Sequence, residues 1–185
     1  MKRLLGLGLL ALASLASLAG CAATDGTSDE GAPSEADSAL SSGGNAHAAF
    51  TFFLGKGLTR IQSAGVVGNL MQESNVDPAS RQAGGLGRGI AQWSVGDRWD
   101  HRSGDNLAWF ARTHGGTSMT LHTQLEFLWF ELETFPSFGL AELRRAGTLS
   151  AAEYAFQVHD EACGRCNEAK RLQNAEQVLT AFGSE

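Results

Sequence analysis

Apolar residues recur at helical spacing over most of the chain beyond residue 45. Within residues 59–75 they fall three or four positions apart, as one face of a packed helix requires; they are Ile61, Ala64, Gly65, Gly68 and Met71. The same spacing recurs just before Pro136, which predicts an amphipathic helix that this proline ends; its positions are Leu121, Leu125, Leu128, Leu132 and Phe135.

Helix-start signals divide the remaining pattern into further helices. Residues 59–62 and 150–153 each have the form of a capping box, in which side chains satisfy free amides of the first turn. Asn45 is placed to cap a short apolar helix that stops at Gly57, and Asn167 to cap the last one.

The fold class expected from these patterns is all-α. Polar and apolar residues do not alternate in paired segments joined by a tight turn, so strand is confined to a small irregular or β-like segment near residues 83–95.

The N-terminus has the pattern of a bacterial export signal. Lys2 and Arg3 precede an apolar run that ends at Ala19, too short for a membrane-spanning helix of about 20 residues. Residues 18–21, LAGC, resemble the lipobox of bacterial lipoproteins, which implies a signal peptide at residues 1–20 and lipidation of Cys21. An uncleaved signal anchor, or a plain secretory signal with an incidental cysteine, is the alternative.

If the lipobox resemblance holds, the protein is exported and lipid-anchored. Ala22 after the cysteine, in place of Asp, fits the periplasmic face of the outer membrane or the cell surface. Residues 21–44 are rich in Ser, Ala, Gly, Asp and Glu and lack aromatic residues, so we expect a disordered tether. Such a tether has a root-mean-square span of roughly 25 Å.

Residues 45–185 are long enough for one domain with its own core. The net charge of −6 gives no basic patch for nucleic acid or for an anionic membrane face. We expect a monomer without a cofactor.

Glu73 ends the segment GNLMQES and stands out as an acid on a half-buried helix. It shares a stripe with Val66, Asn69 and Leu70, and it lies in the last turn, where free carbonyls carry partial negative charge. Both surroundings disfavour a charged carboxylate, as a general acid that works near neutral pH requires. A solvated glutamate at the helix end is the alternative.

The segment AGGLGRGIAQWS, at residues 83–94, follows within twenty residues of Glu73. Its glycines permit backbone shapes that other residues block. Trp93 beside the amide of Gln92 is a pairing that can hold a sugar by stacking and by hydroxyl hydrogen bonds. A plain turn with Trp93 in the core is equally compatible with this stretch.

Taken in order, GNLMQES, N-x-D-P and G-x-GIAQWS resemble the phage tail lysozyme family of peptidoglycan-cleaving enzymes. The resemblance covers most of residues 48–175, including QLEFLWFEL at 124–132. It implies a lysozyme-like helical fold, Glu73 as the catalytic acid, and a sugar site that includes Gly89, Ile90, Gln92 and Trp93. The implied substrate is the β-1,4 bond between N-acetylmuramic acid and N-acetylglucosamine in peptidoglycan.

The reaction type stays open at this point. A hydrolase usually needs a second carboxylate about 5 to 9.5 Å from the first. Asp97 is the candidate carried forward, whereas Asp77 before Pro78 has the character of a turn former. Lytic transglycosylases, which these motifs also resemble, use one Glu as acid and then base. A non-catalytic peptidoglycan-binding lipoprotein is the alternative from a different class.

Cys163 and Cys166 are the remaining candidates for chemistry. In an exported protein a nearby pair of cysteines favours a disulfide, which would act as a local clamp before the last helix. Free thiols or redox activity stay open. Zinc is a weak alternative, because His159 adds a third candidate ligand but no local fourth one follows, so no metal site is expected.

Overall fold

The computed structural model describes residues 35–158 and 167–184, with side chains from residue 43 onward. The signal peptide at residues 1–20, the lipidation of Cys21 and the disulfide between Cys163 and Cys166 are predictions that lie outside the described residues.

The described chain is mainly helical, which confirms the expected fold class. Among these residues no helix has both the length and the apolar character needed to cross a membrane. The elements in chain order are α1 (Glu35–Gly55), α2 (Arg60–Ser74), β1 (Gly87–Arg88), β2 (Trp93–Ser94), α3 (Leu107–Thr113), α4 (Leu121–Thr134), the 3-10 helix η1 (Pro136–Phe138), α5 (Leu140–Arg145), α6 (Leu149–Phe156) and α7 (Glu168–Phe182).

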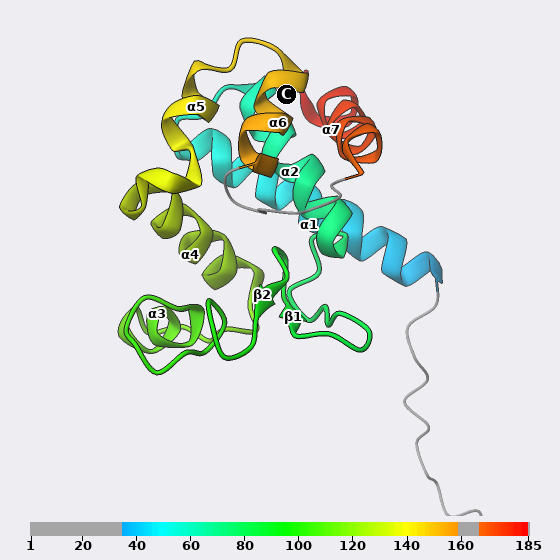
Figure 1. Ribbon diagram of the computed structural model, residues 1–185. Coiled ribbons are helices and arrows are strands. Elements are labelled where there is room, and N and C mark those ends of the chain that lie inside the picture. Colours follow the sequence, from blue (N-terminus) through cyan, green and yellow to red (C-terminus); the bar gives the residue numbers. More distant parts are fainter. Residues whose placement is uncertain (1–34, 159–166, 185) are drawn as a thin grey trace, which may run out of the picture. The chain divides into compact units, whose positions relative to one another are not determined.

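The two strands form one small antiparallel hairpin inside the segment where strand was expected. Gly87 lies opposite Ser94, and Arg88 lies opposite Trp93. Figure 1 shows α4 running from the part of the fold that holds this hairpin and α3 toward the part that holds α5 and α6. The hairpin therefore lies at the opposite end of α4 from those two helices.

Helix α1 begins at Glu35, so the expected start at Asn45 is wrong. Residues 35–42 include Glu, Ala and Leu but no proline, and such residues let a helix extend toward the N-terminus. The helix takes in residues 35–44, which the sequence analysis placed in the tether. Asn45 does not cap it. Its side-chain amide instead donates to the carbonyl of Val76 at 3.1 Å, which ties α1 to the chain after α2.

The capping box at the start of α2 is confirmed. The Thr59 hydroxyl accepts the Gln62 amide N–H at 3.3 Å, and the Gln62 side-chain oxygen accepts the Thr59 N–H at 3.0 Å. The side-chain nitrogen of Gln62 also donates to the carbonyls of Arg144 and Ala146. One side chain therefore joins the start of α2 to the end of α5.

The start of α6 differs from the prediction. Thr148, rather than Ser150, is the N-cap, and its hydroxyl accepts the amide N–H of Ala151 at 3.2 Å. The capping-box spacing singles out Ser150, with Glu153 three residues later, but a hydroxyl two positions earlier can cap a helix without that acid. Glu153 therefore lies in the second turn of α6, where it is buried.

Helix α2 is the central helix of the described fold. Its nine residues from Gln62 to Leu70 are all buried, because α1, α6 and α7 pack against it (Figure 1). A Cβ atom added at Gly68 would lie 2.6 Å from both the backbone nitrogen and the Cβ of Ala175. Glycine at this position is therefore what allows α7 to approach α2 so closely.

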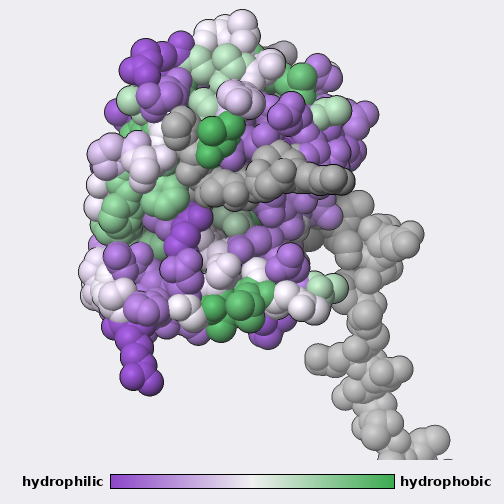
Figure 2. Space-filling model, in the orientation of Figure 1, coloured by the Kyte–Doolittle hydropathy of each residue, from purple (hydrophilic) through white to green (hydrophobic). Residues whose placement is uncertain are grey.

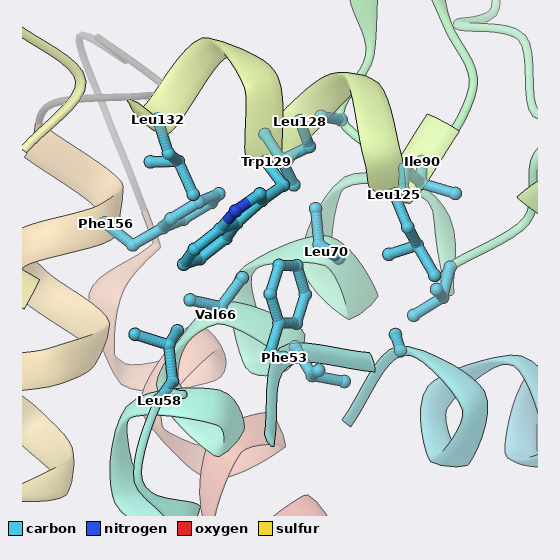
Figure 3. Close-up of a cluster of buried hydrophobic side chains, with 14 of the residues drawn as sticks. Phe53, Leu58, Val66, Leu70, Ile90, Leu125, Leu128, Trp129, Leu132 and Phe156 are labelled. Atoms are coloured by element: carbon cyan, nitrogen blue, oxygen red, sulfur yellow. The ribbon is translucent and has the colours of Figure 1, made fainter. Parts of the chain in front are cut away.

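The hydrophobic core joins α2 to α4 and α6. Figure 3 shows the Trp129 ring among Phe53, Val66, Leu132 and Phe156. The rings of Phe53 and Trp129 lie with their centroids 6.5 Å apart. This packing fixes one face of α2 against the core and leaves its C-terminal turn to carry polar side chains.

Candidate functional site

Glu73 lies in the last turn of α2, and its carboxylate has a cationic partner. The Arg171 guanidinium, from the first turn of α7, donates to Oε1 of Glu73 in a short ion pair. The Glu73 side chain is 19% exposed and that of Arg171 is 4% exposed. Glu73 therefore does not point freely into water. The sequence predicted neighbours along α2 but not this cation, because helical spacing along α2 could not reveal a residue from α7.

Asn69, one helical turn before Glu73, holds the other end of the guanidinium. Its side-chain oxygen accepts from Nη1 of Arg171 at 2.9 Å. Its side-chain nitrogen donates to the carbonyls of Gly65 at 3.0 Å and Glu153 at 3.1 Å. A buried polar network thus joins α2, α6 and α7 directly beneath Glu73.

Glu153 brings a second carboxyl group to this network. The residue is 3% exposed, and its Oε1 has no hydrogen-bond partner within the part of the chain that the structure describes. Burial raises the pKa of Glu153 to about 7, against a smaller opposing effect of Arg171, and Glu168 raises it further. Near neutral pH this side chain is thus divided between its neutral and charged forms.

The segment 89–93 is fastened to the end of α2 beside Glu73. The Ser74 hydroxyl donates to the carbonyl of Ile90 at 2.9 Å. The buried side chain of Gln124, from α4, accepts the Ile90 N–H at 2.9 Å and donates to the carbonyl of Pro78 at 2.9 Å. Gly89 has φ of +69°, and a Cβ there would lie 2.6 Å from Oε1 of Gln124. Only glycine suits that position.

The Gln92 side chain stabilises the conformation of its own loop. Its backbone has φ of +51°, and its side-chain nitrogen donates to the Gly89 carbonyl at 2.9 Å and to the Ser80 hydroxyl at 3.1 Å. The side chain is half-buried. Its amide is therefore already engaged within the protein.

Trp93 lies in the core, which is the alternative that the sequence left open. It is 1% exposed, its ring packs edge-on against Phe127, and its indole N–H donates to Oε2 of Glu131 at 3.0 Å. Ile90 is fully buried as well. Neither side chain exposes a face to solvent in this structure, and the expectation that the segment from Gly89 to Trp93 contributes to the sugar site stays a prediction.

The hairpin offers a different apolar surface to solvent. Leu86, just before β1, is 59% exposed. Figure 2 shows hydrophobic atoms gathered on the surface in the region of β1 and β2. An apolar contact from this hairpin to a ligand would come from such exposed atoms rather than from Trp93.

Asp97 lies elsewhere. It is exposed and lines a cavity of about 390 Å³ together with Arg98, His101 and Asp105. Glu73 is not among the residues that line this cavity, nor among those that line a second cavity of about 350 Å³ beside α5 and α6. Asp97 and Glu73 therefore do not share either of these two cavities. Asp77 accepts the N–H of Ala79 at 2.9 Å, as a turn former does.

Glu131 is a buried acid that the sequence analysis missed. Its carboxylate accepts from Nε of Arg98 at 2.7 Å and from Nη2 at 2.8 Å, in addition to the indole of Trp93. Glu131 and Gln124 lie seven residues apart on α4, which places both on the face toward the loop. This seven-residue spacing is the sequence signal from which Glu131 could have been predicted. No group of three His, Cys, Asp or Glu among the described residues could hold a metal ion.

Arg171 was missed for a different reason. Asn69 and Glu73 are four residues apart and share a helix face, but nothing near residue 171 signals a partner 98 positions away. Only the packing of α7 on α2 brings them together.

A comparison with protein families gives one match of wide extent. The family model described as phage tail lysozyme matches residues 44–182, a range that includes Glu73, the segment 89–93 and Arg171. The comparison with curated proteins gave no match.

Proposed function

The chain belongs to the phage tail lysozyme family and is thus a lysozyme-like enzyme of peptidoglycan cleavage; on this premise we propose that Glu73 is its general acid. The bond cleaved in this proposal is the β-1,4 bond between N-acetylmuramic acid and N-acetylglucosamine.

The observation that carries the proposal is the asymmetric setting of the Glu73 carboxyl group. A guanidinium has only donors, so Oε1, which it contacts, must act as an acceptor. When the carboxyl group is protonated, the proton therefore belongs on Oε2. Within the residues that the structure describes, Oε1 is held by Arg171, and Oε2 is the oxygen proposed to donate a proton to a ligand.

The chemistry follows from one proton transfer. Glu73 gives its proton to the glycosidic oxygen while the bond from that oxygen to the muramic C1 breaks, and positive charge develops on the sugar ring. The carboxylate that remains then accepts a proton from the attacking group. Water as that group gives hydrolysis, and the muramic 6-hydroxyl gives an anhydro product.

The second of these routes requires no other carboxylate. Because Asp97 lines a cavity that Glu73 does not line, we assign no second carboxylate and propose that Glu73 serves as both acid and base. Mass spectrometry of the released muropeptides distinguishes the routes, since the anhydro product is lighter by one water molecule. If hydrolysis is found, Asp97→Asn should abolish it only if Asp97 is the second carboxylate.

The enzyme is proposed to act from a lipid anchor. Residues 1–21 support export and acylation of Cys21, on the periplasmic face of the outer membrane or on the cell surface, and peptidoglycan strands are the expected partner of a monomer. Mass spectrometry of the N-terminal peptide from membranes tests this, because an unmodified Cys21 there would contradict it.

The decisive experiment separates the enzyme from a non-catalytic glycan-binding protein. Purified sacculi are incubated with the wild type, with Glu73→Gln and with Glu133→Gln, which makes the same change at an exposed site on α4. We expect clearing by the wild type and by Glu133→Gln, but not by Glu73→Gln, which should still bind. Binding without clearing by all three proteins would support the glycan-binding alternative.

A further inference from the structure

The Arg171 guanidinium contacts Asn69 as well as Glu73. The residue is 3% exposed, and Nη1 donates to the side-chain oxygen of Asn69 at 2.9 Å and lies 3.5 Å from the Asn69 carbonyl oxygen. Nη2 donates to Glu73. Because the guanidinium is planar, these contacts set the direction from which Oε1 of Glu73 is held.

Asn69, which contacts Arg171, is itself held by hydrogen bonds. The Asn69 side chain donates to the carbonyls of Gly65 and Glu153, and it is fully buried. Asn69 and Glu73 stand four residues apart on α2, and one guanidinium spans both side chains. A lysine has one ammonium group and a flexible stem, so it cannot reproduce this two-point contact.

We infer that Arg171 is a positioning residue for Glu73: together with Asn69 it holds Oε1 of the proposed acid, so that Oε2 carries the proton toward the glycosidic oxygen. The inference rests on the proposed function. Arg171 acts through Glu73 rather than by contact with the substrate. A misplaced acid slows proton transfer while substrate binding is largely kept.

The test measures kcat and KM separately on soluble, uncrosslinked peptidoglycan glycan chains. Arg171→Met has similar length but no donor, and we expect kcat to fall at least about tenfold with KM within about twofold of the wild type. The kcat of Arg171→Lys should lie between that of the wild type and that of Arg171→Met. Arg145→Met is the matched control, because Arg145 pairs with Glu142 on the surface of α5, and its kcat should be unchanged.

Stability is measured in parallel, because removing a buried arginine also weakens the fold. Thermal unfolding identifies a temperature at which every variant is folded, and the kinetics are compared there. If Arg171→Met does not fold, Arg171→Lys and Asn69→Ala decide the matter, and each should lower kcat several-fold without raising KM.

Two results would overturn the inference. Either folded Arg171 variants keep the kcat of the wild type, or their apparent kcat falls only in proportion to the folded fraction, so that the rate per folded molecule is unchanged. Glu73→Gln distinguishes a failure of the positioning role from a failure of the proposed function. If that variant keeps full activity, Glu73 is not the acid. An inactive Glu73→Gln with fully active Arg171 variants rejects the positioning role alone.

Discussion

Arg171 and Glu73 lie 98 residues apart in the sequence and form an ion pair between the first turn of α7 and the last turn of α2. The candidate acid is therefore held by the last helix of the described chain. Its geometry depends on how closely α7 packs against α2, and that distance is set by small residues rather than by the charged ones.

Gly68→Ala tests this dependence without removing a polar group. The added methyl would meet Ala175 at 2.6 Å and push α7 outward, carrying Arg171 away from Glu73. We expect the free energy of unfolding to fall by about 1 to 3 kcal/mol, as for other overpacked interiors. We also expect a lower kcat in the folded protein.

Urea unfolding and steady-state kinetics measure these two effects. Gly147→Ala is the matched control, because a Cβ at Gly147 meets nothing within 4 Å and should leave both quantities nearly unchanged. Full stability and full activity in Gly68→Ala would show that α7 can move without consequence for the acid.

Glu153 predicts how stability depends on pH. Its pKa rises from 4.5 to about 7 on folding, mainly through burial, so between these values the native protein binds more protons than the unfolded chain. Stability from this group is fully present below pH 4.5 and is lost as pH rises through 7. The loss amounts to at most about 3 kcal/mol.

Glu153→Gln keeps the size and stays neutral, so it should lack this loss. Urea unfolding should show that the free energy of unfolding of the variant, relative to the wild type, is higher at pH 8 than at pH 4.5. Glu133→Gln, an exposed change of the same kind, should show no such gain. An equal difference at both pH values would mean that Glu153 does not titrate in this range in the folded protein.

Trp93→Phe distinguishes a core residue from a sugar platform. The substitution keeps an aromatic ring but removes the N–H that donates to Glu131. We expect the free energy of unfolding to fall by about 1 to 3 kcal/mol, since a buried charged acceptor loses one donor. KM for glycan chains should stay within about twofold of the wild type. A raised KM with unchanged stability would instead indicate direct contact with the sugar.

Local patterns predicted the parts of the fold that local chemistry decides. The capping box of Thr59 and Gln62 was correct because both partners lie in one turn. The predicted start of α6 was not, because the capping-box spacing singles out Ser150 whereas the hydroxyl that caps the helix belongs to Thr148. The start of α1 was missed for a similar reason, since Asn45 resembles a cap but donates instead to Val76.

In the candidate site, too, local sequence predicted some features, while others depend on tertiary contacts. Glu73 was identified from its place at a helix end, and the resemblance to a family of cell-wall enzymes directed attention to the loop that follows it. The Arg171 ion pair and the burial of Trp93 depend on contacts between distant segments. Spacing along one element carries no record of such contacts.

The burial of α2 from Gln62 to Leu70 has a consequence for motion. Backbone amides enclosed on every side exchange with deuterium only when the whole fold opens, so this stretch should be among the last to exchange. Glu73 follows this stretch on the same helix, so we expect the candidate acid to be carried by a slowly opening element. On this basis we expect adjustment during turnover to come mainly from the polysaccharide or from the hairpin loops rather than from the backbone of α2.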